Sequence, residues 1–272
     1  MSDNEPLSLN EAQDIALGIL RRFDAICQNL GVQYFGMWGT LIGAARHSGF
    51  IPWDDDLDVA MKRPDYDRLL EYFAQKGEID GLRLENPITN AACPFYISRI
   101  CENSARVIHN EVNYTSGMFI DVYPLDGTGG DGDKASWYKR AKRFNRLRKQ
   151  IYCSRLKGIL YGSTALHRLL NIPLVLTAKL MGSRHYFKII DAESRRFTWN
   201  ESKYCNTPVW TLKPYFMETE WFSRTEHLNF NGFELPVPYK YEQVLNQVYG
   251  DYRKLPPESK RRPSHDYVAY RK

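Results

Sequence analysis

The sequence predicts an α+β fold, in which a short mixed sheet flanked by helices is followed by a mostly helical second half. Three observations lead to this prediction. Apolar residues recur at three- and four-residue spacing after Ser8, as they do in an amphipathic helix. Short runs rich in β-branched and aromatic residues follow between turn-forming residues, and each has the length of a strand. From Lys134 onward the spacing becomes helical again.

The first half of the chain is expected to alternate helices and strands. Ser8 and Glu11 form a capping-box pattern at the start of the N-terminal helix, and Gly31 ends it. The strand-like runs are 32–38, 56–61, 82–85, 96–100 and 117–123. The further helices are expected at 41–46 and 65–75. Pro124, Asp126 and the glycines that follow are expected to end the last strand in a loop.

In the second half, residues 134–200 are expected to be helical and basic. The dipeptide Asn231-Gly232 favours a type I′ turn, which predicts a β-hairpin between 228–230 and 233–235. A helix is expected at 241–248, ending at Gly250.

No linker forces a division of the chain. We expect a catalytic core in residues 1–130 with a basic helical region in residues 131–272 packed on it, as two domains or as one continuous domain. The net charge is +5, from 37 Lys and Arg against 32 Asp and Glu, and the excess is concentrated in 134–157 and 253–272. Basic surfaces attract phosphates, whether on a nucleotide or on an anionic membrane. No recognition motif accompanies the charge, so we expect no nucleic-acid partner.

The composition excludes several classes of protein. Hydrophobic residues make up 43% of the chain, which is ample for a packed core. The five cysteines are widely spaced, which argues against a disulfide framework and a structural zinc site. We expect no secretory signal. We expect a cytoplasmic location, which includes the inner face of the membrane. The apolar segment 169–181 is too short to span a bilayer, and we expect it to be a buried helix rather than a membrane-surface one.

Four aspartates in five positions are the strongest chemical signal in the chain. They follow Trp53 directly and lead into an apolar strand: Asp54, Asp55, Asp56 and Asp58. Such a cluster repels itself by about 1 kcal/mol per close pair, so it is kept for solvation or for a cation. Residues two apart on a strand share a face, so Asp56 and Asp58 can hold one divalent ion together. The alternative is an acidic turn that faces water.

The surrounding pattern indicates chemistry at phosphorus. Gly39-Thr40 opens a helix, whose free N–H groups and positive end suit a phosphate. Asp121 lies in the middle of an apolar strand, where an unpaired charge is costly, and a metal shared with Asp56 and Asp58 is its expected partner. These carboxylates predict bound Mg²⁺ or Mn²⁺ and transfer of a phosphoryl group, with Asp121 as the general base.

Three further residues are candidates for substrate binding. Arg46 suits the donor phosphates, unless it pairs with a spare aspartate on the surface. His47 suits a donor contact or a proton transfer, against a structural role in the loop that follows. Trp53 suits stacking on a base or on a trimethylammonium group, against core packing. Arg262 and His265 of the tail are weaker candidates for closing over the site.

The motif that carries these residues resembles the signature of the LicD family. It runs GTLIGAARH from Gly39 and GFIPWDDDLD from Gly49, and the resemblance extends to FIDVYPLD from Phe119 and to YGDY from Tyr249. It therefore covers most of the chain. The resemblance implies a nucleotidyltransferase-type fold, and Asp56, Asp58 and Asp121 match the family's metal-binding carboxylates. Gly39 and Thr40 match its phosphate-contacting turn.

The family resemblance also implies a reaction. LicD-like bacterial proteins transfer phosphocholine from CDP-choline to teichoic acid, lipopolysaccharide or another surface glycan, and fukutin-type relatives transfer other phospho-alcohols. Nothing in the chain resembles the zinc insertion of the fukutin-related protein, which favours the compact bacterial type. We therefore predict a CDP-alcohol donor, a glycan or lipid-linked glycan acceptor and release of CMP, with peripheral membrane contact as a further expectation.

Two other functions fit parts of the sequence. Asp56-Leu57-Asp58 is also a D-x-D pattern, as in metal-dependent glycosyltransferases, which would release a nucleoside diphosphate. That interpretation leaves Gly39-Thr40 and Asp121 unexplained. The basic segment 134–157 also fits a non-catalytic scaffold that binds anionic lipid, and salt-sensitive binding that survives loss of the aspartates would identify it.

Overall fold

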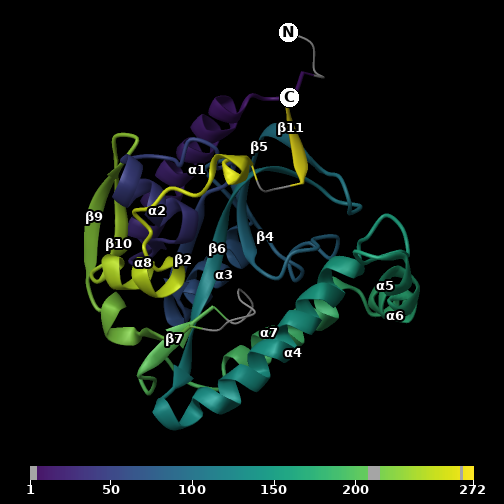
Figure 1. The fold of residues 1–272 in the computed structure, drawn as a ribbon. Helices are drawn as coiled ribbons and strands as arrows, with labels where there is room; N and C mark the ends of the chain where they lie inside the picture. The colour runs from purple at the N-terminus through teal and green to yellow at the C-terminus, as the bar shows by residue number, and fades with distance from the viewer. Residues whose placement is uncertain (1–4, 208–214, 264–265) are drawn as a thin grey trace.

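A mixed sheet with helices against its faces organises the fold, in agreement with the predicted α+β class (Figure 1). The computed structural model describes residues 5–207, 215–263 and 266–272. In this part of the chain, nine strands form one sheet: β1 (Phe35–Gly36), β2 (Asp58–Lys62), β6 (Thr115–Gly129), β5 (Ser98–His109), β4 (Leu82–Glu85) and β3 (Glu78–Ile79) in that order, with β11 (Tyr267–Arg271) beside β5, β7 (Tyr204–Asn206) beside β6 and β8 (Met217–Glu218) beside β7. A separate hairpin pairs β9 (Thr225–Phe230) with β10 (Phe233–Pro238).

The centre of the sheet brings three separate parts of the sequence together. β2 runs parallel to β6, with Asp58 opposite Asp121. β5 runs antiparallel to β6 on its other side, with Arg99 opposite Asp121. Two buried carboxylates and a buried guanidinium therefore lie side by side in the middle of the sheet.

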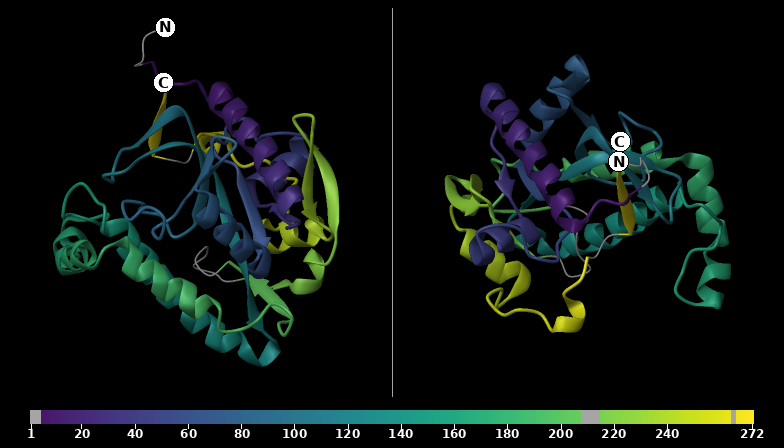
Figure 2. Two further views of the ribbon diagram at one scale, coloured as in Figure 1. Left: turned by 180° about the vertical axis from the view of Figure 1, so that it is seen from behind. Right: turned by 90° about the horizontal axis from the view of Figure 1, so that it is seen from above.

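Helices cover the sheet and form a second body beside it (Figures 1 and 2). The α-helices of the described residues are α1 (Leu9–Leu30), α2 (Trp38–His47), α3 (Arg63–Lys76), α4 (Lys134–Cys153), α5 (Ala165–Leu170), α6 (Ile172–Met181), α7 (Ser183–Ser194) and α8 (Tyr241–Tyr249). The predicted capping box of α1 is present, and Gly31 ends the helix with φ 65°. The buried residues of α1, which include Ile19, Leu20 and Phe23, join the core that the sheet shares with α2 and α3.

Several predicted elements are confirmed. The strand at 82–85, the helix at 65–75 within α3 and the helix at 241–248 within α8 lie where the patterns place them. The turn between β9 and β10 has positive φ at both Asn231 (51°) and Gly232 (74°), as a type I′ turn requires.

Three strand predictions are wrong in extent, and the run predicted at 96–100 is the longer β5. The run 32–38 forms only the two-residue β1, because α2 already begins at Trp38. The strand predicted to end before Pro124 continues to Gly129. Parallel pairing with β2 continues past Pro124 to Leu125, and β7, almost 80 residues later, then pairs with the end of β6. Such long-range partners leave no signal in the local sequence.

The basic segment is helical as predicted, but strands follow it. α4, α6 and α7 enclose a second apolar cluster around Trp137, Phe144 and Ile151. Of the strands that follow α7, the sequence predicts the hairpin of β9 and β10 but not β7, β8 or β11. β7 and β11 pair with β6 and β5, so strands from the region after residue 131 complete the sheet of the region before it.

The helix predicted to be buried at 169–181 is instead largely exposed. Leu180 is 84% exposed and Leu170 is 67% exposed, while Val175 and Ala178 are buried. The prediction failed because apolar content alone does not distinguish a buried helix from a helix that presents an apolar face. In the described part of the chain, no helix has both the length and the apolar character needed to cross a membrane.

Arg63 forms a buried ion pair within the sheet body and a second ion pair with the helical body. Arg63 at the start of α3 donates from Nε and Nη2 to both carboxylate oxygens of Asp126 on β6, at 2.5 and 2.7 Å. Its Nη1 donates to Asp191 of α7 at 2.9 Å. Arg63 and Asp126 are both buried, so neither charge has water as a substitute partner.

We predict that Arg63→Met lowers the free energy of unfolding by about 3–5 kcal/mol, because it leaves Asp126 buried without its cation. The urea midpoint measures this effect. Arg21→Met, at an exposed position of α1, is the control and is expected to change the midpoint little. An equally small effect of both substitutions would show that the buried ion pair does not stabilise the fold.

Candidate active site

The predicted carboxylates come together where β2 begins beside the middle of β6. Asp58 is the first residue of β2, and parallel pairing sets it beside Asp121. Asp56 precedes β2 by two residues. One carboxylate oxygen of each of Asp56, Asp58 and Asp121 lies within 4.8 Å of the other two. The three side chains are therefore as close as a shared ion requires, and their assignment as metal ligands stays a prediction.

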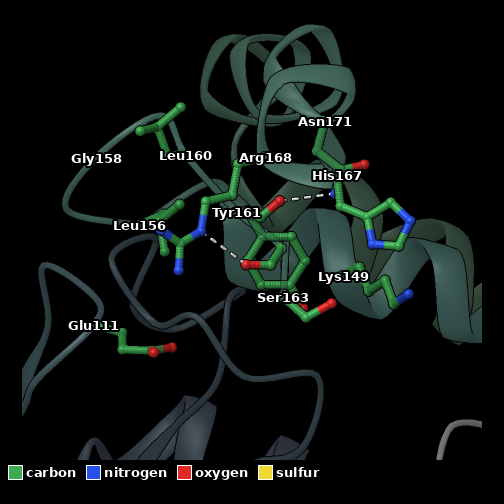
Figure 3. Close-up of a pocket in the computed structure, with 11 residues that line it drawn as sticks. Glu111, Lys149, Leu156, Gly158, Leu160, Tyr161, Ser163, His167, Arg168 and Asn171 are labelled. Carbon is green, nitrogen blue, oxygen red and sulfur yellow. Dashed lines mark hydrogen bonds between the residues drawn. The ribbon is translucent and has the colours of Figure 1, made fainter. Parts of the chain in front are cut away.

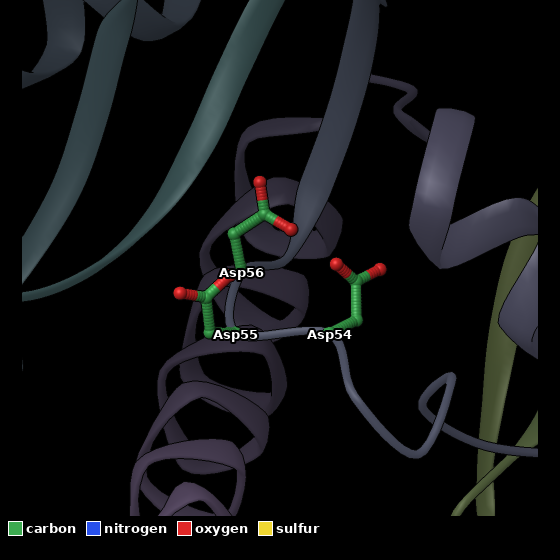
Figure 4. A group of neighbouring side chains, drawn as sticks. All are labelled: Asp54, Asp55 and Asp56. Atoms are coloured by element: carbon green, nitrogen blue, oxygen red, sulfur yellow. The ribbon is translucent and has the colours of Figure 1, made fainter. Parts of the chain in front are cut away.

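A second acidic group adjoins the first. The loop that leads into β2 carries the side chains of Asp54, Asp55 and Asp56 (Figure 4). One carboxylate oxygen of each of the three lies within 4.8 Å of the other two. The loop is held in place from two sides: Gln13 of α1 donates to the carbonyl oxygen of Asp54 at 2.8 Å, and Tyr267 of β11 donates to that of Asp55 at 2.5 Å. Asp56 belongs to both groups, so it joins the loop to the buried pair.

The environment of Asp58 fits a divalent cation. Asp58 is 4% exposed, and its Oδ1 is buried without a hydrogen-bond partner among the described residues. Burial, and then the charges of Asp56, Asp121 and Asp54, raise the pKa of Asp58 well above its ordinary value. An unpartnered buried carboxylate oxygen beside other carboxylates is the donor set that Mg²⁺ or Mn²⁺ prefers. The residues present therefore fit the predicted metal.

Arg99 is a site residue that the sequence prediction missed. It is 4% exposed, and its Nε donates to Oδ1 of Asp121 at 2.7 Å. Its guanidinium lies between the rings of Phe95 and Phe119, at 3.5 and 3.7 Å from the two ring centres. The expected partner of Asp121 was a metal alone, but Arg99 already supplies a positive charge. An arginine within the strand predicted at 96–100 was the available signal, because it too needs a buried partner.

Aromatic side chains form one wall of the site. Trp38 begins α2 with φ 47°, a left-handed conformation that is rare for a large side chain. Its ring centre lies 4.3 Å from that of Tyr123, and its Nε1 donates to the hydroxyl of Tyr215 at 3.1 Å. Tyr123, two residues after Asp121, is hydrogen-bonded to Asp58. The carboxylates thus lie against a rigid aromatic surface.

Two tyrosines complete the surroundings of the carboxylates. Burial raises the pKa of Tyr96 to about 12, against the opposing charge of Arg148. Loss of solvent, and then the charge of Asp58, raises the pKa of Tyr249 at the end of α8. Both hydroxyls are therefore protonated at neutral pH and can donate hydrogen bonds.

Gly39 and Thr40 lie at the site but make contacts other than the predicted ones. Both lie inside the first turn of α2 rather than before it. The hydroxyl oxygen of Thr40 accepts a hydrogen bond from the Asp58 N–H at 2.8 Å, which fixes the start of β2. A Cβ on Gly39 would lie 2.5 Å from Oδ2 of Asp54. A carboxylate, rather than a phosphate, therefore lies against Gly39, and phosphate contact by these residues stays a prediction.

Arg46 contacts the C-terminal segment and the neighbouring His47. Arg46 donates from Nη1 to the carbonyl oxygen of Tyr252 at 2.7 Å and from Nε to Nε2 of His47 at 2.9 Å. Loss of solvent and the charge of Arg46 lower the pKa of His47, which keeps the imidazole neutral as an acceptor. These contacts favour the structural role weighed for His47, and donor contact by Arg46 stays a prediction.

Trp53 is also engaged by neighbouring side chains. The guanidinium of Arg261 lies 5.7 Å from its ring centre, and His47 approaches it edge-on at 6.4 Å. One face of Trp53 is therefore covered by a cation, which leaves less of the ring for a base or a choline group. Arg262 is exposed, and His265 lies outside the described residues.

Comparison with known proteins agrees with this geometry. Residues 31–154 match the family model described as LicD/FKTN/FKRP, nucleotidyltransferase domain. This range contains β2, β5 and β6 and all the carboxylates of the site. Over this range the chain is similar to the LicD family. The LicD resemblance seen in the sequence is thereby confirmed.

Individual LicD relatives extend the likeness beyond that range. The lipopolysaccharide cholinephosphotransferase LicD of Haemophilus influenzae is 28% identical over 279 residues, which cover 97% of this chain and 98% of the relative. An uncharacterized protein of Rickettsia prowazekii is 32% identical over 99 residues, or 34% of each chain. An uncharacterized protein of Rickettsia typhi is 43% identical over 49 residues, or 17% of this chain and 16% of the relative.

We predict that Asp58→Asn raises the stability of the metal-free protein at neutral pH by about 1–2 kcal/mol, as relief of strain at an active site often does. The raised folded-state pKa means that the ionised carboxylate costs stability above that pKa, and the cost disappears as the pH falls to the unfolded value. The melting temperatures of variant and wild type should therefore converge in acid. A variant that melts below the wild type at neutral pH would contradict this prediction.

Proposed function

We propose that this chain transfers phosphocholine from CDP-choline to a hydroxyl of lipopolysaccharide or another surface glycan and releases CMP. The full-length likeness to a lipopolysaccharide cholinephosphotransferase carries the proposal. The acidic site supports it, because Asp56, Asp58 and Asp121 lie within the matched family region and face one another.

Asp56, Asp58 and Asp121 would hold Mg²⁺ or Mn²⁺. When bound, the metal offsets the negative charge of the donor phosphates and of the transition state. Asp54 and Asp55 extend the acidic surface towards the loop, where they would add carboxylates for the same ion or for a second one.

The acceptor hydroxyl must lose its proton as it attacks. In the proposed reaction its oxygen forms a bond to the phosphorus of phosphocholine, the bond from that phosphorus to the CMP oxygen breaks, and CMP leaves with the electron pair. Asp121 accepts the hydroxyl proton. The hydrogen bond from Arg99 to Oδ1 leaves Oδ2 of Asp121 for this work and holds the carboxylate in one orientation.

Tyrosines beside the carboxylates suit a quaternary ammonium group. Tyr123 packs against Trp38, and Tyr96 and Tyr249 lie within the electric field of Asp58. Aromatic faces bind trimethylammonium groups well, and nearby negative charge strengthens that attraction. Because Trp38 and Tyr123 are buried, we assign the choline group to the partly exposed Tyr96 and Tyr249 rather than to Trp53.

We predict that the purified protein releases CMP from CDP-choline in the presence of Mg²⁺ or Mn²⁺ and lipopolysaccharide, as measured by mass spectrometry of the nucleotide product. Asp58→Asn should lower turnover at least about a hundredfold, because it removes a charged metal ligand from the site. Asp80→Asn, at an exposed turn with φ 51°, is the matched control and should retain full activity.

The nucleotide product separates the proposal from its alternatives. Release of CMP from CDP-ribitol or CDP-glycerol but not from CDP-choline would change the alcohol and keep the reaction. Release of a nucleoside diphosphate from a nucleotide sugar would identify the glycosyltransferase alternative. An active Asp58→Asn variant would refute the metal site itself.

We also predict that Gly39→Ala weakens CDP-choline binding about tenfold, or about 1.4 kcal/mol. The added Cβ meets the Asp54 carboxylate at 2.5 Å and must displace it from the acidic loop. Calorimetric titration measures the effect. Gly18→Ala is the control, because its Cβ meets nothing within 4 Å on α1. Equal affinities for both variants would show that the position of Asp54 is irrelevant to the donor.

A further inference from the structure

The hairpin formed by α5 and α6 exposes an unusual amount of apolar surface. It projects from the helical body, away from the sheet (Figures 1 and 2). Its exposed apolar residues, with those of the loop before it, are Ile159, Leu160, Leu166, Leu169, Leu170, Leu176, Leu180 and Met181. Soluble proteins rarely expose so many large aliphatic side chains in one short segment without a partner for them.

The exposed apolar residues are not the ones that pack the hairpin against the rest of the protein. Val175 and Ala178 of α6 are fully buried against the cluster of α4 and α7, so the hairpin is anchored through them. The Nζ of Lys179 donates to the carbonyl oxygen of Leu156 at 2.6 Å and holds the preceding loop. Leu176 and Leu180, one turn apart on α6, are 52% and 84% exposed. An anchored helix would normally turn a polar face to water, and α6 does not.

Positive charge predominates around the hairpin. Between Asp133 and Asp191 the chain contains 14 Lys and Arg and no Asp or Glu. At the base of the hairpin, a cavity of about 620 Å³ is lined by Lys149, His167 and Arg168, with Glu111 as its acidic residue (Figure 3). Two copies of such a surface would repel each other, whereas an anionic lipid surface complements it.

We propose that the α5–α6 hairpin is a peripheral membrane-docking element that binds anionic phospholipid bilayers. Its leucines enter the boundary between head groups and acyl chains, and the surrounding lysines and arginines contact lipid phosphates. α6 is about 15 Å long, which suits a helix lying in the interface and not one crossing the bilayer. This docking does not depend on the proposed reaction.

Sedimentation with vesicles tests the proposal without any donor or acceptor. Wild-type protein should bind vesicles made of equal parts phosphatidylglycerol and phosphatidylcholine, and binding should weaken as salt is added. Leu176→Glu with Leu180→Glu should lower the partition coefficient at least about tenfold. Leu255→Glu, at a 48% exposed position of the C-terminal segment, is the matched control and should bind as the wild type does.

A second readout separates insertion from loss of folding. In Leu180→Trp, the new tryptophan adds a blue-shifted emission component when anionic vesicles are present. The proposal is overturned if the double variant, still folded by circular dichroism, binds as the wild type does. It is also overturned if phosphatidylcholine vesicles alone bind equally well in low salt. A third contrary result is that the double substitution dissociates a dimer, measured by sedimentation velocity without lipid, and leaves vesicle binding unchanged.

Discussion

The site depends on placing two carboxylates side by side in the middle of a buried sheet. Parallel pairing of β2 with β6 puts Asp58 opposite Asp121, where solvent cannot separate their charges. Arg99, on the other neighbour of β6, offsets part of this repulsion. Burial, and then the charges of the neighbouring carboxylates, still raise the pKa of Asp58. The divalent cation proposed above would offset this remaining unfavourable charge.

The rest of the fold keeps that arrangement rigid. Thr40 of α2 fixes the start of β2, and the long strand β6 passes from the carboxylates to Asp126. Asp126 in turn pairs with Arg63, which reaches α7 through Asp191. Strand β6 and the ion pairs of Arg63 therefore join the acidic site to the helical body.

Segments far apart in the sequence enclose the site from the C-terminal side. Arg46 holds the carbonyl oxygen of Tyr252, Arg261 stacks on Trp53, and Tyr267 of β11 fixes the acidic loop at Asp55. Residues first considered as ligand contacts, Arg46 and Trp53, thus bind the protein's own chain. The helical body contributes differently, because its α5–α6 hairpin turns apolar side chains outward instead of towards the core.

Local patterns in the sequence determined the α+β class, the N-terminal helix with its capping box, the Asn231-Gly232 hairpin and the acidic motif. Each of these depends on neighbours within a few residues, so spacing is sufficient to predict it. Only the tertiary structure decided that Arg99 pairs with Asp121, that β6 continues beyond Pro124 and that α6 is exposed. Those features depend on partners distant in sequence, and strand pairing, not local propensity, brings such partners together.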